Sequence, residues 1–198
     1  PWHDIYVDDH IIASGFPVSL QLGALAMLIA SVVGVALGSL AALRQNRPAD
    51  YGTMAVAMTG ISVPNFVVGP LLVLVFAVYL GWLPAGGLGE GSAAAGGWRN
   101  LVLPVFTLAL TQVAYIARLM RANLSENLRT DYVRTAKAKG LTNRRTVGVH
   151  TLRNSLIPVV TYIGIDIGAL MGGAIVTERI FNINGIGNFL FRSIGQKD

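Results

Sequence analysis

One ionisable side chain lies inside a long apolar run of this sequence and is the first candidate for chemistry. Asp166 is the single charge between Leu156 and Thr177, a stretch of 22 residues. An acid in such a run is costly in lipid and normally faces the interior of a helix bundle or a water-filled cavity. Asp166 is therefore predicted either to line a pathway for a solute or to hydrogen-bond between helices, and the sequence leaves both open.

A proline with polar neighbours is the second candidate. Pro64 follows Ser62 in the stretch 61–66 (ISVPNF), within an uncharged run from Tyr51 to Leu80. A proline inside a helix removes a backbone hydrogen bond and favours a kink. The kink, with the Ser62 hydroxyl beside it, either serves packing alone or shapes a pathway.

The sequence lacks the patterns of common catalytic and metal sites. There is no Cys, and His3, His10 and His150 do not have the spacing of metal ligands. The Gly-x-x-x-x-Gly-Lys-Ser/Thr loop that holds nucleotide phosphates is missing, as is the Gly-x-Ser-x-Gly elbow of serine hydrolases. We therefore predict that the chain is not an enzyme and holds no metal or cofactor of its own.

The longest polar segment, 122–155, has a pattern that suits docking. Residues 131–140 (DYVRTAKAKG) predict a short helix, with Thr130 or the aspartate after it as N-cap and Gly140 as a left-handed C-terminal residue. A second helix is predicted over 143–153. Spacing alone leaves two interpretations open, an element that docks a protein and a basic helix pair on anionic lipid headgroups.

Four apolar runs are long enough to place these residues in a membrane. The sequence of 198 residues is 53% hydrophobic and 13% charged, whereas an ordinary soluble domain is about 25% charged. Because a membrane helix needs about 20 apolar residues, we predict an all-α polytopic membrane helical bundle. It forms a single domain over 1–198, with a cytoplasmic loop at about 122–155 and spans at about 19–43, 51–80, 101–121 and 156–177.

The basic residues orient this bundle. Eleven of the 15 Lys and Arg residues fall in the segments 44–50 and 118–155. Both segments are therefore predicted to be cytoplasmic, since positive residues gather on that side of a membrane. The net charge of +5 then reflects topology and contact with membrane lipid, and no nucleic acid is expected as a partner.

Small residues recur every four positions in two of the predicted spans. They are Gly34 and Gly38 in the first span and Gly164, Gly168 and Gly172 in the fourth. Such stripes let helix backbones approach closely, so they predict helix packing faces. They carry no information about what the bundle does.

Several separated motifs resemble the permeases of ABC importers, and more narrowly the dipeptide, oligopeptide and nickel branch. Residues 132–141 (YVRTAKAKGL) and 150–158 (HTLRNSLIP) resemble the cytoplasmic EAA loop of that family. Three further stretches resemble the same branch in the same order, namely 61–66 (ISVPNF), 81–84 (GWLP) and 177–187 (TERIFNINGIG).

The resemblance implies a fold, partners and a docking site. The fold is the type I ABC importer transmembrane domain, with four spans present of an expected six, in a bacterial or archaeal cytoplasmic membrane. The implied partners are a second homologous permease subunit, two cytoplasmic ABC ATPase subunits that hold ATP and Mg, and an extracytoplasmic substrate-binding protein. The short helix would dock on an ATPase subunit, and the positions carried over are Asp131, Tyr132, Val133, Thr135, Ala136, Ala138 and Gly140.

The sequence thus predicts the channel-forming permease subunit of an ATP-driven importer of di- or oligopeptides. The alternative is an ion-coupled secondary carrier that uses Asp166 and the break at Pro64, although the two halves show no repeat of the kind such carriers have. The chain has no initiating Met, and its resemblance implies flanking spans, so the intact subunit is expected to be longer.

Overall fold

The computed structural model describes residues 13–87, 97–171 and 174–196, and every regular element in these ranges is a helix. The all-α prediction is therefore confirmed for the part of the chain that the structure describes. The chain divides into two compact units, each described by itself. Unit 1 comprises residues 1–28, 63–110 and 166–198, and unit 2 comprises residues 29–62 and 111–165.

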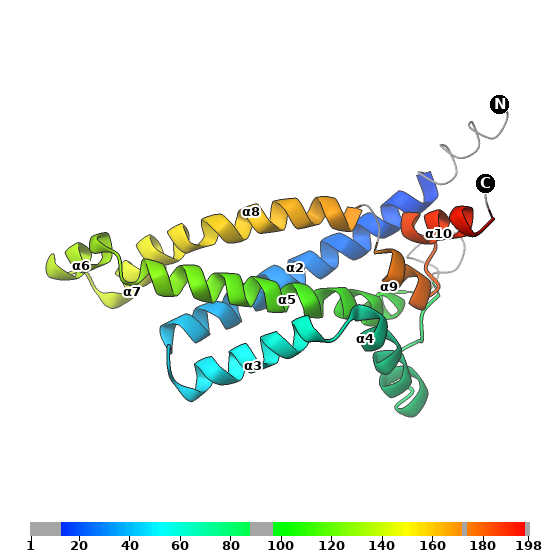
Figure 1. The fold of residues 1–198 in the computed structure, drawn as a ribbon, viewed down its shortest axis with the longest axis horizontal. Coiled ribbons are helices and arrows are strands. Elements are labelled where there is room, and N and C mark those ends of the chain that lie inside the picture. Colours follow the sequence, from blue (N-terminus) through cyan, green and yellow to red (C-terminus); the bar gives the residue numbers. More distant parts are fainter. Residues whose placement is uncertain (1–12, 88–96, 172–173, 197–198) are drawn as a thin grey trace. The chain divides into compact units, whose positions relative to one another are not determined.

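Three long helices carry most of the apolar sequence: α2 (Ala13–Leu43), α5 (Arg99–Asn127) and α8 (Leu152–Met171), all labelled in Figure 1. In the described residues, α2 and α5 are long and apolar enough to cross a membrane. The helices of the second apolar run add a third span if they are taken together as one broken span. Four spans remain a prediction, because the fourth run includes residues 172–173, which lie outside the described ranges.

The second apolar run is broken at its proline. Helix α3 (Pro48–Ser62) ends two residues before Pro64, and α4 (Asn65–Leu72) begins directly after it and continues as a π-helical segment, Val73–Tyr79. Pro64 has an extended backbone (φ −63°, ψ 144°) at the N-cap of α4. The predicted kink within one helix is therefore a break between two helices. A proline suits the start of a helix, where its missing N–H costs no hydrogen bond.

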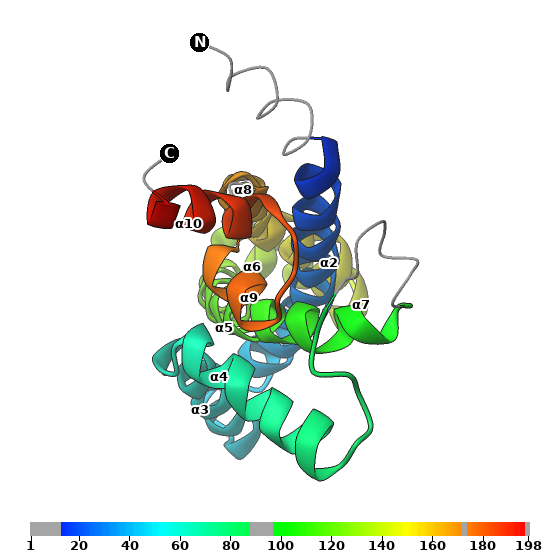
Figure 2. The ribbon, with the colours of Figure 1, turned by 90° about the vertical axis from the view of Figure 1, so that its right-hand side faces the viewer.

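The core of unit 1 is built around the C-terminal turn of the chain. Helix α9 (Ile175–Ile180) lies between α4 and α10 (Ile186–Gln196), as Figure 2 shows. Phe181 and Ile183, between α9 and α10, are almost fully buried among side chains that include Leu22 of α2 and Leu103 of α5. Burial of each such side chain contributes about 1.5–3 kcal/mol, so this cluster fixes the α9–α10 turn.

The core of unit 2 depends on close contact between α2 and α5. A Cβ atom added to Gly34 would lie 2.8 Å from the Cβ of Ile116, and one added to Gly38 would lie 2.7 Å from the Cβ of Met120. The two helices can approach this closely only because both positions lack a side chain.

The glycines of α8 lie in different surroundings. No described atom lies within 4 Å of a Cβ added to Gly164 or Gly168, and both glycines are exposed. Gly172 lies outside the described residues. Gly164 and Gly168 therefore pack against nothing in the described part of this chain, and their role in helix packing stays a prediction.

Candidate functional site

The polar segment after α5 folds into a short helix, α6 (Asp131–Ala138), which lies beyond the ends of α5 and α8 in unit 2 (Figure 1). Thr130 occupies the N-cap position, but its hydroxyl donates to the carbonyl of Asn127 at 2.6 Å and caps nothing in α6. Gly140 has φ +77°, the left-handed conformation that the sequence predicts. The Leu141 N–H then returns to the Ala136 carbonyl at 3.1 Å, which closes the helix end.

The two faces of α6 have different surroundings. Val133 is fully buried, so in this structure it anchors α6 to its own unit and cannot reach a partner protein. Successive helical residues are rotated by about 100°, which places Asp131, Thr135 and Ala138 on the side opposite Val133. All three are exposed, whereas Ala136 is half-buried. The exposed face made of Asp131, Thr135 and Ala138 is therefore the side of α6 that points away from its own unit and is open to a partner.

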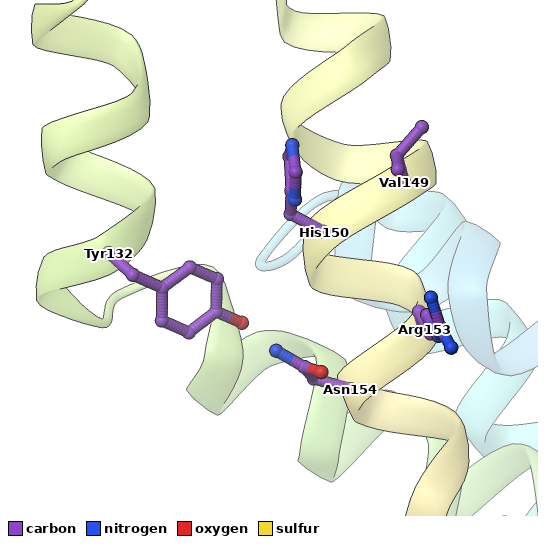
Figure 3. Close-up of a pocket in the computed structure, with 5 residues that line it drawn as sticks. All are labelled: Tyr132, Val149, His150, Arg153 and Asn154. Atoms are coloured by element: carbon purple, nitrogen blue, oxygen red, sulfur yellow. The ribbon is translucent and has the colours of Figure 1, made fainter.

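Tyr132 belongs to a groove beside α6 that is drawn in Figure 3. The groove has a volume of about 480 Å³. The Tyr132 ring points across the groove, with its hydroxyl toward Asn154 at the start of α8. The other lining residues are Val149, His150 and Arg153. Sequence reasoning placed only Tyr132 at the site, although the stretch 150–158 was part of the motif that resembles the EAA loop.

A hydrogen bond joins the end of α5, which precedes α6, to the start of α8, which follows it. The Asn127 amide donates to the Ser155 hydroxyl at 3.0 Å, and that hydroxyl donates to the Thr151 carbonyl at 2.8 Å. Thr151 is itself fully buried and lies at the end of a π-helical segment, Thr146–Thr151, which joins α7 (Asn143–Arg145) to α8. The predicted helix over 143–153 therefore runs into α8 as one helical path with a π-helical section.

An ion pair fixes the start of α3 to α5 in unit 2. The Arg121 guanidinium donates to both carboxylate oxygens of Asp50, at 2.6 and 2.7 Å. Asp50 is fully buried and also accepts the backbone N–H of Asn46 at 2.9 Å. Sequence reasoning missed this pair, because its members are 71 positions apart and nothing local links them.

A second buried carboxylate lies in unit 1. Glu178 of α9 is fully buried and accepts the Ser19 hydroxyl at 2.7 Å and the Asn188 backbone N–H at 3.0 Å. Gly185 lies so close that an added Cβ would contact the Glu178 carboxylate, and a Cβ on Gly187 would lie 3.0 Å from it. The glycines of the stretch 177–187 therefore make room for this carboxylate.

The three residues predicted for a pathway are placed as follows. Asp166 is on α8, and its Oδ2 is buried without a hydrogen-bond partner in the described residues. The Ser62 hydroxyl donates to the Met58 carbonyl of its own helix at 2.8 Å. Asp166 and Pro64 belong to unit 1 and Ser62 to unit 2, and a pathway role for all three stays a prediction. Within the described ranges, no three His, Asp or Glu side chains lie close enough together to hold a metal ion.

Comparison with known proteins decides the family. Residues 34–198 match the family described as binding-protein-dependent transport system inner membrane component. The chain belongs to this family. The predicted membership among the permeases of ABC importers is therefore confirmed, and this permease chain is an inner-membrane protein.

Curated relatives of this permease chain are peptide transport permeases. It is 46% identical over 186 residues to the oligopeptide transport system permease protein OppB of Haemophilus influenzae, covering 94% of this chain and 59% of that protein. It is 43% identical over 188 residues to the dipeptide transport system permease protein DppB of Bacillus subtilis, covering 95% of this chain and 59% of that protein. The permease chain thus spans about three fifths of the length of these relatives.

A solved structure has the same fold. The crystal structure of an amino acid ABC transporter with histidines superposes with a TM-score of 0.71, covering 99% of this chain and 84% of that one. At 15% sequence identity the likeness shows the fold alone. The predicted fold class, an ABC importer transmembrane domain, is confirmed.

Proposed function

We propose that this chain is part of a permease subunit that forms a channel for di- or oligopeptides in an ATP-driven importer. Its family membership and its peptide permease relatives support this function. The observation that carries the proposal is the exposed face of α6, made of Asp131, Thr135 and Ala138 on a helix that Val133 anchors from behind.

The proposed mechanism assigns different tasks to different polypeptides. ATP and Mg bind to two cytoplasmic ATPase subunits, and no cofactor is expected on this chain. A second permease subunit completes the channel, and an extracytoplasmic substrate-binding protein delivers the peptide. Movement of the ATPase pair reaches the membrane helices through α6. The Asn127–Ser155 hydrogen bond joins α5, which precedes α6, to α8, which follows it.

Substitution on the exposed face of α6 tests this proposal. Ala138→Trp in the full-length subunit places a large ring where the ATPase would dock, and we expect at least about tenfold less ATPase to co-purify, a loss of about 1.4 kcal/mol in binding. Asn143→Trp is the matched control, because Asn143 is also exposed but lies at the start of α7.

Two outcomes of this experiment would contradict the proposal. The first is a purified wild-type subunit that brings down no ATPase carrying a nucleotide-binding loop. The second is equal retention of that ATPase by Ala138→Trp, Asn143→Trp and the wild type, which would show that α6 does not dock it.

A further inference from the structure

The groove beside α6 is rich in hydrogen-bond donors, and none of the described residues that line it is an acid. Tyr132 brings a hydroxyl from α6, and the segment that leads into α8 brings Val149, His150, Arg153 and Asn154. The imidazole, the guanidinium and the amide all present N–H groups, and the guanidinium is always charged. The Tyr132 hydroxyl and the Asn154 side chain point toward each other across the groove (Figure 3). This set of side chains suits an anionic group.

The donors of the groove are not used within the part of the chain that the structure describes. No hydrogen bond or ion pair there engages the Tyr132 hydroxyl, the Arg153 guanidinium or the Asn154 amide. Arg121 shows the contrast, because it donates to both carboxylate oxygens of Asp50. The Arg153 guanidinium can bind a carboxylate of another protein in the same two-bond geometry.

Both walls of the groove are fixed from behind. Val133, which follows Tyr132, is fully buried. Thr151 and Ser155, which lie on either side of Arg153 in the chain, are buried as well, and the Ser155 hydroxyl donates to the Thr151 carbonyl at 2.8 Å. The groove is therefore formed before a partner arrives, so less conformational entropy is lost when the partner binds.

The surroundings of the groove are strongly basic. Residues 131–155 include one acid, Asp131, and six basic side chains that are all exposed: Arg134, Lys137, Lys139, Arg144, Arg145 and Arg153. The acid lies 3.5 Å from the Arg134 guanidinium and is therefore itself paired. An acidic surface complements this region, whereas a basic surface would be repelled.

A protein fits this region better than a membrane surface does. A helix that lies on lipid headgroups buries an apolar face at the boundary of the acyl chains. In α6 the apolar residue Val133 is buried in its own unit, and apart from Tyr132 the exposed positions are polar, charged or alanine. Helix α6 thus offers no apolar face to lipid, and an acidic protein surface is the better partner.

We infer that the groove between α6 and the start of α8 binds an Asp or Glu side chain on the docking surface of the ATPase subunit. The inference rests on the proposed function and adds a second docking point to the exposed face of α6. The Arg153 guanidinium donates two N–H groups to the carboxylate, and the Tyr132 hydroxyl and the Asn154 amide donate to its remaining lone pairs. Because Arg153 lies in the first turn of α8, this contact joins the ATPase to α8 directly.

Removal of one charge inside the groove and one outside it tests the inference. Arg153→Gln and Arg144→Gln each remove an exposed guanidinium, but Arg144 lies in α7 and does not line the groove. The measurement is the affinity of the ATPase for the full-length permease in lipid nanodiscs. We expect about tenfold weaker binding for Arg153→Gln, which loses hydrogen bonds to a charged group. Arg144→Gln should change binding by less than about twofold, because an isolated exposed charge contributes little.

A cross-link identifies the group that enters the groove. Arg153→Lys keeps the positive charge and supplies an amine that a carbodiimide can join to a carboxylate in contact with it. An amide bond forms, and the carbodiimide takes up the water that is lost. Mass spectrometry should find the new lysine joined to an Asp or Glu of the ATPase, whereas Arg144→Lys, the matched control, should give no such product.

The outcomes separate this inference from the proposed function. Equal affinity of Arg153→Gln and Arg144→Gln, where the wild type binds the ATPase, would overturn the groove contact alone. The same holds if Arg153→Lys is joined to no acid of the ATPase. An effect of Arg153→Gln that appears with anionic lipid and disappears with zwitterionic lipid would show that the groove binds a headgroup, and would also overturn the inference. A wild-type permease that binds no ATPase would overturn the proposed function itself.

Discussion

Each of the two units has a fully buried carboxylate residue in its described part, and the two residues are held in different ways. In unit 2, Asp50 pairs with the guanidinium of Arg121 through two hydrogen bonds. In unit 1, Glu178 is held by neutral donors, a serine hydroxyl and a backbone N–H, with Gly185 packed against it. The first arrangement depends on a matching charge and the second on shape. Substitutions that change charge alone or shape alone should therefore affect the two units differently.

Removal of the charge at Asp50 should have the largest effect. Asp50→Asn leaves the Arg121 guanidinium without its counter-ion, and removing one partner of a buried pair costs about 3–5 kcal/mol. Because the Arg121 side chain is 29% exposed, we expect the lower end, about 3 kcal/mol, in unfolding of the full-length subunit in detergent. Glu178→Gln keeps its shape and an acceptor oxygen and should cost only about 1 kcal/mol.

The double variant provides the control for that comparison. Asp50→Asn with Arg121→Gln removes both charges, so it should be no less stable than Asp50→Asn alone. Additive losses from the two substitutions, or a larger loss from Glu178→Gln than from Asp50→Asn, would mean that charge pairing does not distinguish the units.

A change of shape should act on unit 1. Gly185→Ala would push a methyl group against the Glu178 carboxylate, and overpacking of this kind costs about 1–3 kcal/mol. The same substitution should cost less in a Glu178→Ala background, because the carboxylate that it would strike is gone. A double-mutant cycle in thermal unfolding measures this coupling, and a coupling of zero would rule out the shape argument.

The smallest expected effect concerns one hydroxyl. Ser19 donates to Glu178 and accepts the Ile186 backbone N–H at 3.0 Å, so Ser19→Ala should cost about 1 kcal/mol. Ser62→Ala is the matched control, because the exposed Ser62 hydroxyl bonds only to a carbonyl of its own helix. Equal stability of the two variants would show that the Ser19 hydroxyl adds nothing to the carboxylate site.

Features that depend on local sequence were predictable. The long apolar runs predicted helices where α2 and α5 lie, and a glycine after a short polar helix predicted the left-handed residue at Gly140. Pro64 was expected to disturb its helix and separates two helices. In each case the cause acts within a few residues, through hydrophobic length or backbone preference.

Features that depend on distant partners were missed. No local pattern predicts that Asp50 and Glu178 are buried, yet both are fully buried. Val133 was expected to meet a partner protein, but it packs inside its own unit, because a helical pattern of eight residues does not show which face turns inward.

Uptake of a labelled oligopeptide into vesicles that contain the complete transporter tests the central claim most directly. The predicted result is uptake that requires ATP and the substrate-binding protein, that proceeds without an ion gradient, and that Ala138→Trp abolishes while Asn143→Trp does not. Uptake that persists without ATP and follows an imposed proton gradient would contradict the claim and favour an ion-coupled carrier.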